Sequence, residues 1–269
     1  MISETKTRGY TVTSLIKSSG LLADMRLLLA AWDENKTVEE NFESALRQNL
    51  FGKASRKRVA DLLYVIKRRY LPQDGSDRAF RTFVSSSLPS EITDRVLYYY
   101  TALAEPLIYD FVTDFLFERY LIYNQPITIQ SALDFIQEAI RQEKTKGQWE
   151  SENTRERVAQ GLLATLRDFG VLEGVVRSSD KRIAEPRLHI LAFGYIAFHI
   201  KRCEPSGERL VNHPNWRLFL LGTRQVERLL TEADAEGLLT YQAAGSVIRI
   251  EFPTLDFEEY SHALTARAF

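Results

Sequence analysis

The sequence predicts a mainly α-helical protein, a multi-helix bundle that contains helix-turn-helix-like units and a small C-terminal β-hairpin of winged-helix type. Apolar residues recur at three- and four-residue spacing through most of the chain, the pattern of amphipathic helices. The alternation typical of strands is clear only in LLTYQ and SVIRIEF, near the C-terminus. With 269 residues, 45% apolar and 26% charged, the chain can bury a sizeable core and form two domains.

The N-terminal part is predicted to form a series of helices. Residues 11–32 have helical spacing that residues 18–20 interrupt, so a short helix should precede a longer one. Thr37 is placed to cap the next helix, because Glu40 stands at the third position of a capping box. Residues 49–53 are expected to form a turn before a further helix.

That further helix is unusually basic. Ser55 is its predicted N-cap. Between Arg47 and Leu71, eight lysines and arginines accompany a single carboxylate, Asp61, which gives the segment a net charge of +7 in a chain of −1. Apolar residues form one buried stripe at helical spacing, namely Val59, Leu62, Leu63, Ile66 and Tyr70.

Residues 38–70 thus have the order helix, short turn, basic helix, which is the order of a helix-turn-helix unit. Cations opposite a buried stripe are suited to contact phosphates, although a solvated or charge-balanced basic face has the same pattern. The predicted phosphate contacts are Arg56, Lys57 and Arg58 at the start of the helix and Lys67 and Arg68 at its end.

Three further helices are predicted over residues 77–86, 91–104 and 107–123. The last carries Asp110, Asp114 and Glu118 at spacings of four, so the three carboxylates share one face. Such a face suits a metal ion or an acid–base pair, but no histidine or second acidic motif accompanies it. A solvated or arginine-paired face explains it better, and we predict no metal site here.

Asn124 to Pro126 interrupts the helical pattern and predicts a boundary between an N-terminal domain, 1–123, and a C-terminal domain, 124–269. After a helix over 128–143, the next helix, 154–169, begins TRERVA, whereas the basic helix begins SRKRVA. One explanation of this repeat is that the chain contains two helix-turn-helix units of common origin. The other is coincidence, because the agreement between the two segments ends after TRERVA. A second DNA footprint is predicted at Arg155 and Arg157.

The C-terminal part contains the longest uncharged apolar run, residues 188–200. Its 13 residues fall short of the roughly 20 needed to cross a bilayer, so we predict a buried helix and no transmembrane segment.

A helix over 223–236, capped by Thr223, precedes the hairpin, whose turn is expected at 243–245. This hairpin either lies along a phosphate backbone as a wing or merely covers the core. In the first case the predicted contacts are Arg224, Arg228 and Arg249.

The sequence offers no motif of known catalytic chemistry. No stretch fits a phosphate-binding glycine loop, a dinucleotide fingerprint, a zinc-binding histidine pair or a nucleophile elbow. The four histidines are scattered. A single cysteine, Cys203, leaves no internal disulfide and fits a reducing cytoplasm. We therefore expect a cytoplasmic protein that is not an enzyme and has no cofactor, catalytic residue or metal.

Four segments between residues 18 and 174 carry a family likeness. They are SSGLLADMRLLLAAW, NLFGKASRKRVADLLYVIKRRY, LYYYTALAEPLIYDFVTDFLFERY and QWESENTRERVAQGLLATLRDFGVLEG. In this order they resemble the BrxA family of bacteriophage-exclusion (BREX) defence systems. The resemblance implies a helical, non-enzymatic protein that binds double-stranded DNA beside the methyltransferase, phosphatase-like and ATPase components. It implies no functional residues.

Three other functions remain open. A protein-interaction adaptor would use the basic face and, as aromatic anchors, the tyrosine-rich helix 96–109. An RNA-binding protein would use the same cations as a DNA-binding one. A hydrolase built on Asp110, Asp114 and Glu118 would require a divalent metal.

Overall fold

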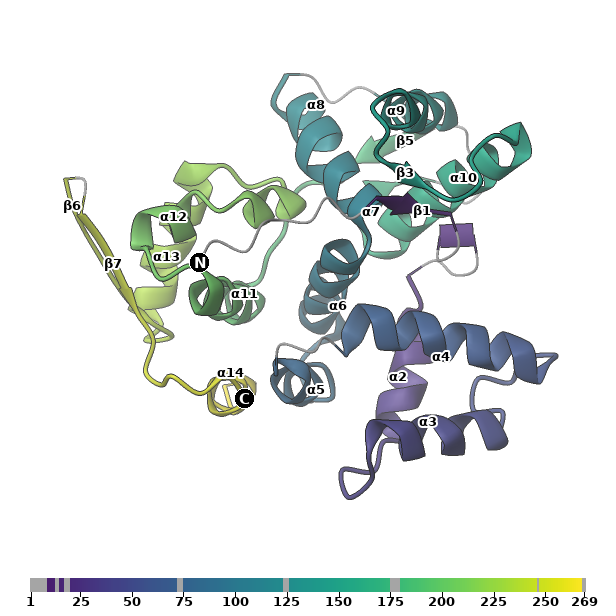
Figure 1. The fold of residues 1–269 in the computed structure, drawn as a ribbon. Coiled ribbons are helices and arrows are strands. Elements are labelled where there is room, and N and C mark those ends of the chain that lie inside the picture. Colours follow the sequence, from purple (N-terminus) through teal and green to yellow (C-terminus); the bar gives the residue numbers. More distant parts are fainter. Residues whose placement is uncertain are drawn as a thin grey trace. The chain divides into compact units, whose positions relative to one another are not determined.

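The computed structural model describes residues 9–12, 15–16, 20–71, 75–122, 126–174, 180–245 and 247–267, and these are mainly helical, as predicted (Figure 1). Contacts group the chain into two units, each made of two separate stretches of sequence. Unit 1 joins residues 1–21 to 101–185, and unit 2 joins 22–100 to 186–269. The predicted boundary between 123 and 124 falls among residues 123–125, outside the described ranges, and stays a prediction.

The first stretch of unit 2 contains α2 (Leu22–Ala30), α3 (Val38–Arg47), α4 (Arg56–Tyr70), α5 (Asp77–Val84) and most of α6 (Ser90–Ala104). The predicted capping box is confirmed at α3. The backbone N–H of Glu40 donates to Thr37 Oγ1 at 3.2 Å, and the N–H of Thr37 donates to Glu40 Oε2 at 2.8 Å.

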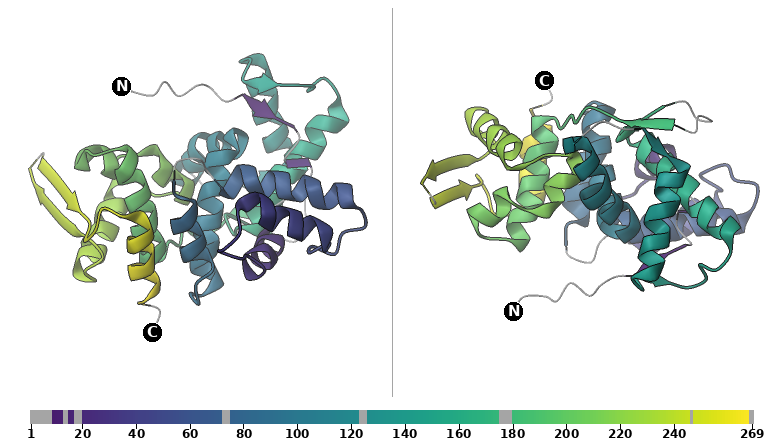
Figure 2. Two further views of the ribbon diagram at one scale, coloured as in Figure 1. Left: turned by 60° about the horizontal axis from the view of Figure 1, so that its bottom comes forward. Right: turned by 90° about the horizontal axis from the view of Figure 1, so that it is seen from above.

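The second stretch contains α11 (Ile190–Cys203), α12 (Gly207–Val211), a 3₁₀ turn (Pro214–Phe219), α13 (Thr223–Ala235), β6 (Thr240–Ala244), β7 (Val247–Glu251) and α14 (Phe257–Thr265). Figure 2 shows α14 lying beside α5, with which it packs.

The C-terminal hairpin is confirmed, with Thr240 opposite Glu251 and Ala244 opposite Val247. Two details of its prediction were wrong. Ala243 and Ala244 belong to β6 and not to the turn, and Thr223 is the first residue of α13 and not its cap. The N-cap is Gly222.

The tyrosines of α6 form part of the core of unit 2. Tyr98, Tyr99 and Tyr100 are all buried, and each hydroxyl has a hydrogen-bond partner. Tyr99 Oη lies 3.1 Å from His199 Nδ1, and the side chain of Asn215 donates to it at 2.9 Å. The expectation that these tyrosines are surface anchors was therefore wrong, because burial and satisfied hydroxyls leave them inaccessible to a partner.

The described residues of unit 1 form α7 (Pro106–Asp110), a π-helical turn (Phe111–Leu116), α8 (Phe117–Ile122), α9 (Ile129–Arg141), α10 (Glu152–Asp168) and five short strands. Strand β1 (Tyr10–Thr11) pairs in parallel with β3 (Thr145–Lys146), and β5 (Asp180–Ile183) pairs with both β2 (Ile127–Thr128) and β4 (Leu172–Glu173). The sequence did not predict these strands. Strands β1 to β4 have two residues each, too few to show an alternating pattern, and β5 reads DKRI, in which a charged residue, Lys181, takes one of the two buried positions.

The π-helical turn changes the register between the three carboxylates of the predicted helix 107–123. The hydroxyl of Tyr10 donates to Asp110 Oδ2, which ties β1 to the end of α7. Within the described ranges, no group of three histidine, cysteine or acidic residues is arranged to hold a metal ion. In the same ranges, no helix has the length and apolarity to span a bilayer.

Candidate functional site

The turn between α3 and α4 is held by one side chain. Asn49, which has a φ of +49°, accepts from the backbone N–H of Lys53 through Oδ1 and donates to the carbonyl of Lys53 through Nδ2, both at 2.9 Å. Gly52 supplies a second left-handed residue, with a φ of +59°. These contacts fix the direction in which the chain enters α4.

Helix α4 begins where the sequence predicted. The N–H of Arg58 donates to Ser55 Oγ at 3.2 Å, so Ser55 is the N-cap. All five residues of the predicted stripe are buried, and the ring of Tyr70 stacks on that of Phe80 with centroids 5.6 Å apart. The buried stripe fixes which side of α4 faces solvent.

The first turn of α4 carries three consecutive cations. Arg56 and Lys57 are exposed and Arg58 is half-buried. Among the residues that the structure describes, none of the three has a carboxylate partner. The free N–H groups of a helix start add partial positive charge, so the first turn is suited to bind an anion.

Other cations of the basic segment are less available than the net charge of +7 suggests. Lys53 forms an ion pair with Asp24 at 2.8 Å, and Arg69 is only 1% exposed. At the end of α4, Lys67 Nζ lies 2.8 Å from Glu39 Oε1. That contact lowers the pKa of Glu39 through a hydrogen bond from Lys67. Arg68 is half-buried. The start of α4 is therefore the stronger anion site.

Tyr64 is a candidate contact that the sequence reading missed. Its side chain is 63% exposed although it is a large aromatic. It lies seven residues after Lys57, on the same side of the helix and about 10 Å further along the axis at about 1.5 Å per residue. The signal was present in the sequence, since position 64 falls outside the apolar stripe of α4.

The second predicted footprint belongs to unit 1. Arg155 Nη1 donates to the carbonyls of Trp149 and Glu150 at 2.9 and 2.8 Å, so its guanidinium fastens the segment before α10. Arg157 is exposed. Helix α10 begins at Glu152, two residues before the predicted start, and Thr154 therefore lies inside the helix. The repeated six residues do not occupy equivalent positions in α4 and α10.

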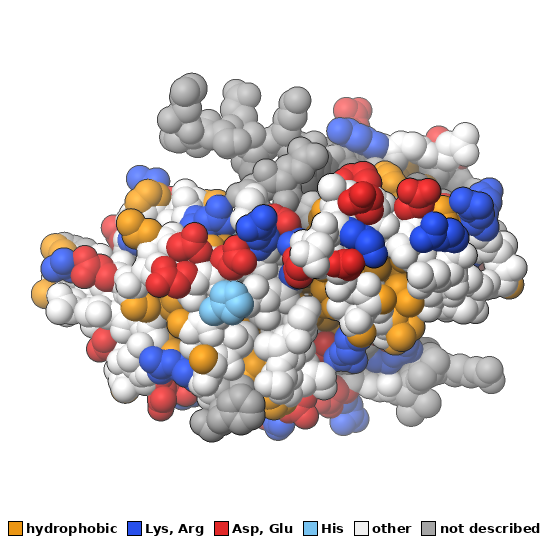
Figure 3. Space-filling model, turned by 90° about the horizontal axis from the view of Figure 1, so that it is seen from below, with side chains coloured by type: hydrophobic (Ala, Val, Ile, Leu, Met, Phe, Trp, Pro, Cys, Tyr) orange, Lys and Arg blue, Asp and Glu red, His pale blue; other side chains and the backbone are white. Residues whose placement is uncertain are grey.

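The third predicted group lies on α13 and the hairpin. Arg224 and Arg228 are exposed, and Arg249 pairs with Glu251 at 2.7 Å. Figures 1 and 2 show α13 and the hairpin at the end of unit 2 that is opposite to α3 and the start of α4. The structure therefore does not bring these arginines together with the first turn of α4. Figure 3 shows cationic and acidic side chains interleaved on one face of the molecule.

Comparison with known families gives a match to the BrxA family model over residues 10–199, which is most of the chain. The matched range includes all of α3, α4 and α10. No curated protein matches the chain.

Proposed function

Because the chain belongs to the BrxA family, and is thus a component of a BREX defence system, we propose that it binds double-stranded DNA through the first turn of α4. Family membership does not indicate an enzyme. The role we propose is that of a non-enzymatic accessory protein, acting beside the methyltransferase, phosphatase-like and ATPase components of the system.

One observation supports this proposal above the others. Arg56, Lys57 and Arg58 occupy the first turn of a capped helix, and no carboxylate of the described residues neutralises them. Lysine and arginine that neutralise phosphates supply most of the affinity in sequence-independent DNA binding. The buried stripe behind them anchors α4, so the cations need no large rearrangement to meet a phosphate backbone.

We propose that α3 and α4, which residues 48–55 connect, act together as a helix-turn-helix-like unit in which α4 is the second helix. At 15 residues, α4 is about 22 Å long, and the major groove of B-DNA, about 12 Å wide, admits such a helix. In this arrangement Arg56, Lys57 and Arg58 contact phosphates, and Tyr64 lies next to the duplex with Lys67 and Arg68 at the far end. Arg155, Arg157, Arg224, Arg228 and Arg249 are proposed as weaker secondary contacts.

Charge reversal tests the proposal. The double variant Arg56→Glu/Arg58→Glu should bind a labelled duplex more weakly than the wild type in fluorescence anisotropy. A matched control is Arg78→Glu/Arg209→Glu, which makes the same change in net charge at two exposed arginines of unit 2 outside α4. Equal losses of duplex affinity in the two double variants would show that the first turn of α4 is not the DNA-binding site.

Competition identifies the nucleic acid. Unlabelled duplex DNA should displace the labelled duplex at lower concentration than a structured RNA of equal length. Displacement by the RNA at lower concentration would assign the same face to RNA instead.

A further inference from the structure

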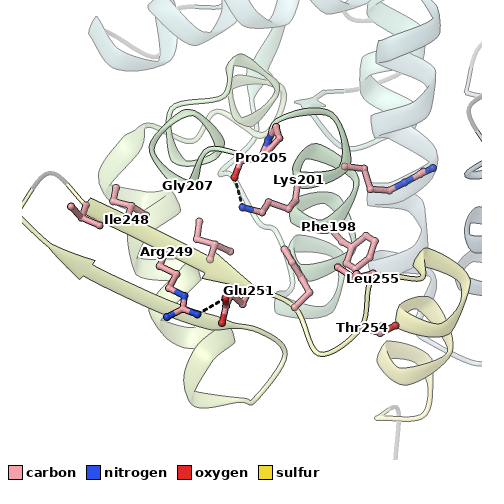
Figure 4. Close-up of a pocket in the computed structure, with 13 residues that line it drawn as sticks. Phe198, Lys201, Pro205, Gly207, Ile248, Arg249, Glu251, Thr254 and Leu255 are labelled. Atoms are coloured by element: carbon pink, nitrogen blue, oxygen red, sulfur yellow. Dashed lines mark hydrogen bonds and ion pairs between the residues drawn. The ribbon is translucent and has the colours of Figure 1, made fainter.

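A groove of about 740 Å³ lies beside β7 (Figure 4). In Figure 1, β7 lies at the end of unit 2 that is opposite to the start of α4. Its walls are β7, the connection from β7 to α14, and the end of α11 with the start of α12. Ligand sites typically occupy about 300–1,000 Å³, so this volume is sufficient for one. The five residues of β7 span about 17 Å, which is enough for an extended segment of similar length.

The groove is mostly apolar and its rim is unusually exposed. Phe198 and Ile250 are buried beneath it. At the rim, Val247 is 69% exposed and Leu255 is 98% exposed. Contact with a partner would remove these side chains from water, so exposed apolar residues beside a groove favour such contact.

The charge of the groove favours an acidic partner. Among the described residues, Lys201, Arg202 and Arg249 line it with a single carboxylate, Glu251, which gives this part of the lining a net charge of +2. Arg249 and Glu251 compensate each other at 2.7 Å. The ammonium group of Lys201 donates to the carbonyl of Pro205, a neutral acceptor that does not compensate its charge (Figure 4).

We propose that this groove binds a peptide segment of a partner protein in which apolar side chains are flanked by aspartate or glutamate. The apolar side chains of the peptide would cover Val247 and Leu255, and a carboxylate would reach Lys201. The groove suits a peptide better than duplex DNA, because its apolar lining and Glu251 offer little to a phosphate backbone. Arg249, which we propose only as a weaker duplex contact, is already paired with Glu251. The inference does not depend on DNA binding by α4, and it gives the chain a separate surface for contact with other proteins.

Peptide display on the full chain tests the proposal. Phage carrying random 12-residue peptides are selected on the wild type and counter-selected on Leu255→Asp. The enriched peptides are then synthesised and their affinities measured by fluorescence anisotropy. We expect apolar peptides with flanking carboxylates that bind Leu255→Asp at least tenfold more weakly and Lys201→Glu several-fold more weakly. Leu27→Asp, at an exposed leucine on α2, is the matched control and should bind them like the wild type.

Several results would overturn the proposal. One is a failure to enrich peptides, and another is enrichment of peptides that bind Leu255→Asp as well as the wild type. A loss of duplex affinity in Leu255→Asp would assign the groove to DNA, and loss of a wild-type dimer in sedimentation would assign it to a second copy of the chain. If circular dichroism shows that Leu255→Asp does not fold, Lys201→Glu decides the question alone.

Discussion

Replacing Arg56 and Arg58 by glutamate should weaken duplex binding while leaving the fold at least as stable. Three phosphate contacts at the first turn of α4 correspond to a slope of about −2.7 in log K against log salt. The affinity of this turn should then fall about 40-fold between 50 and 200 mM salt. With only Lys57 left, the slope becomes about −0.9 and the fall about 3.5-fold.

Stability should move in the opposite direction. Neither arginine has an ion-pair partner among the described residues, and carboxylates in the first turn of a helix are favoured by its dipole, by about 0.3–1 kcal/mol each. Anisotropy titrations at four salt concentrations give the slopes, and urea unfolding gives the stability. An unchanged slope would refute the contact model, whereas a less stable variant would mean that the two arginines support the fold.

Tyr64→Ala should weaken duplex binding several-fold and change the free energy of unfolding by less than about 0.5 kcal/mol, because the ring is exposed; unchanged anisotropy would exclude the ring from the interface. Tyr10→Phe should cost about 1.5–3 kcal/mol at pH 7, since its hydroxyl donates to a carboxylate. Burial raises the pKa of the Asp110 carboxyl above its usual 3.8, so Asp110 holds its proton to higher pH in the native state than in the unfolded chain. The contribution of Asp110 to stability therefore falls as pH rises from the unfolded pKa through the native one. Urea unfolding across pH measures both effects, and a stability gain over that window would contradict the sign. Asn49→Ala should lower the melting temperature more than Asn49→Gly. Both variants lose the hydrogen bonds to Lys53, but a φ of +49° destabilises only alanine, by about 1 kcal/mol. Equal losses in melting temperature would show that the backbone conformation at this position does not limit stability.

The local parts of the fold could be predicted from the sequence. Caps such as Thr37 and Ser55 and the apolar stripe of α4 depend on residues close in the chain, and the structure confirms them. The two units could not be predicted, because each joins stretches far apart in sequence. The contact between Tyr10 and Asp110, 100 residues apart, leaves no periodic signal.

The candidate site was predictable only in part, for the same reason. Counting charges along α4 could not show that Lys67 meets Glu39, 28 residues earlier, or that Arg69 is buried. Likewise, the sequence alone makes the tyrosines of α6 look like interface anchors, because it does not reveal the buried residues that bind their hydroxyls, such as Asn215. Ion pairs and burial depend on tertiary contacts, and these decide which cations of a basic segment remain available to a ligand.

Lysine footprinting tests most directly whether the first turn of α4 contacts duplex DNA. The full chain is acetylated with and without a saturating duplex at low salt, and the modified lysines are quantified by mass spectrometry. Lys57 should be protected, whereas the exposed Lys146 of β3 should be modified equally in both samples. Equal modification of Lys57 in the two samples, with the duplex shown to be bound, would contradict the account.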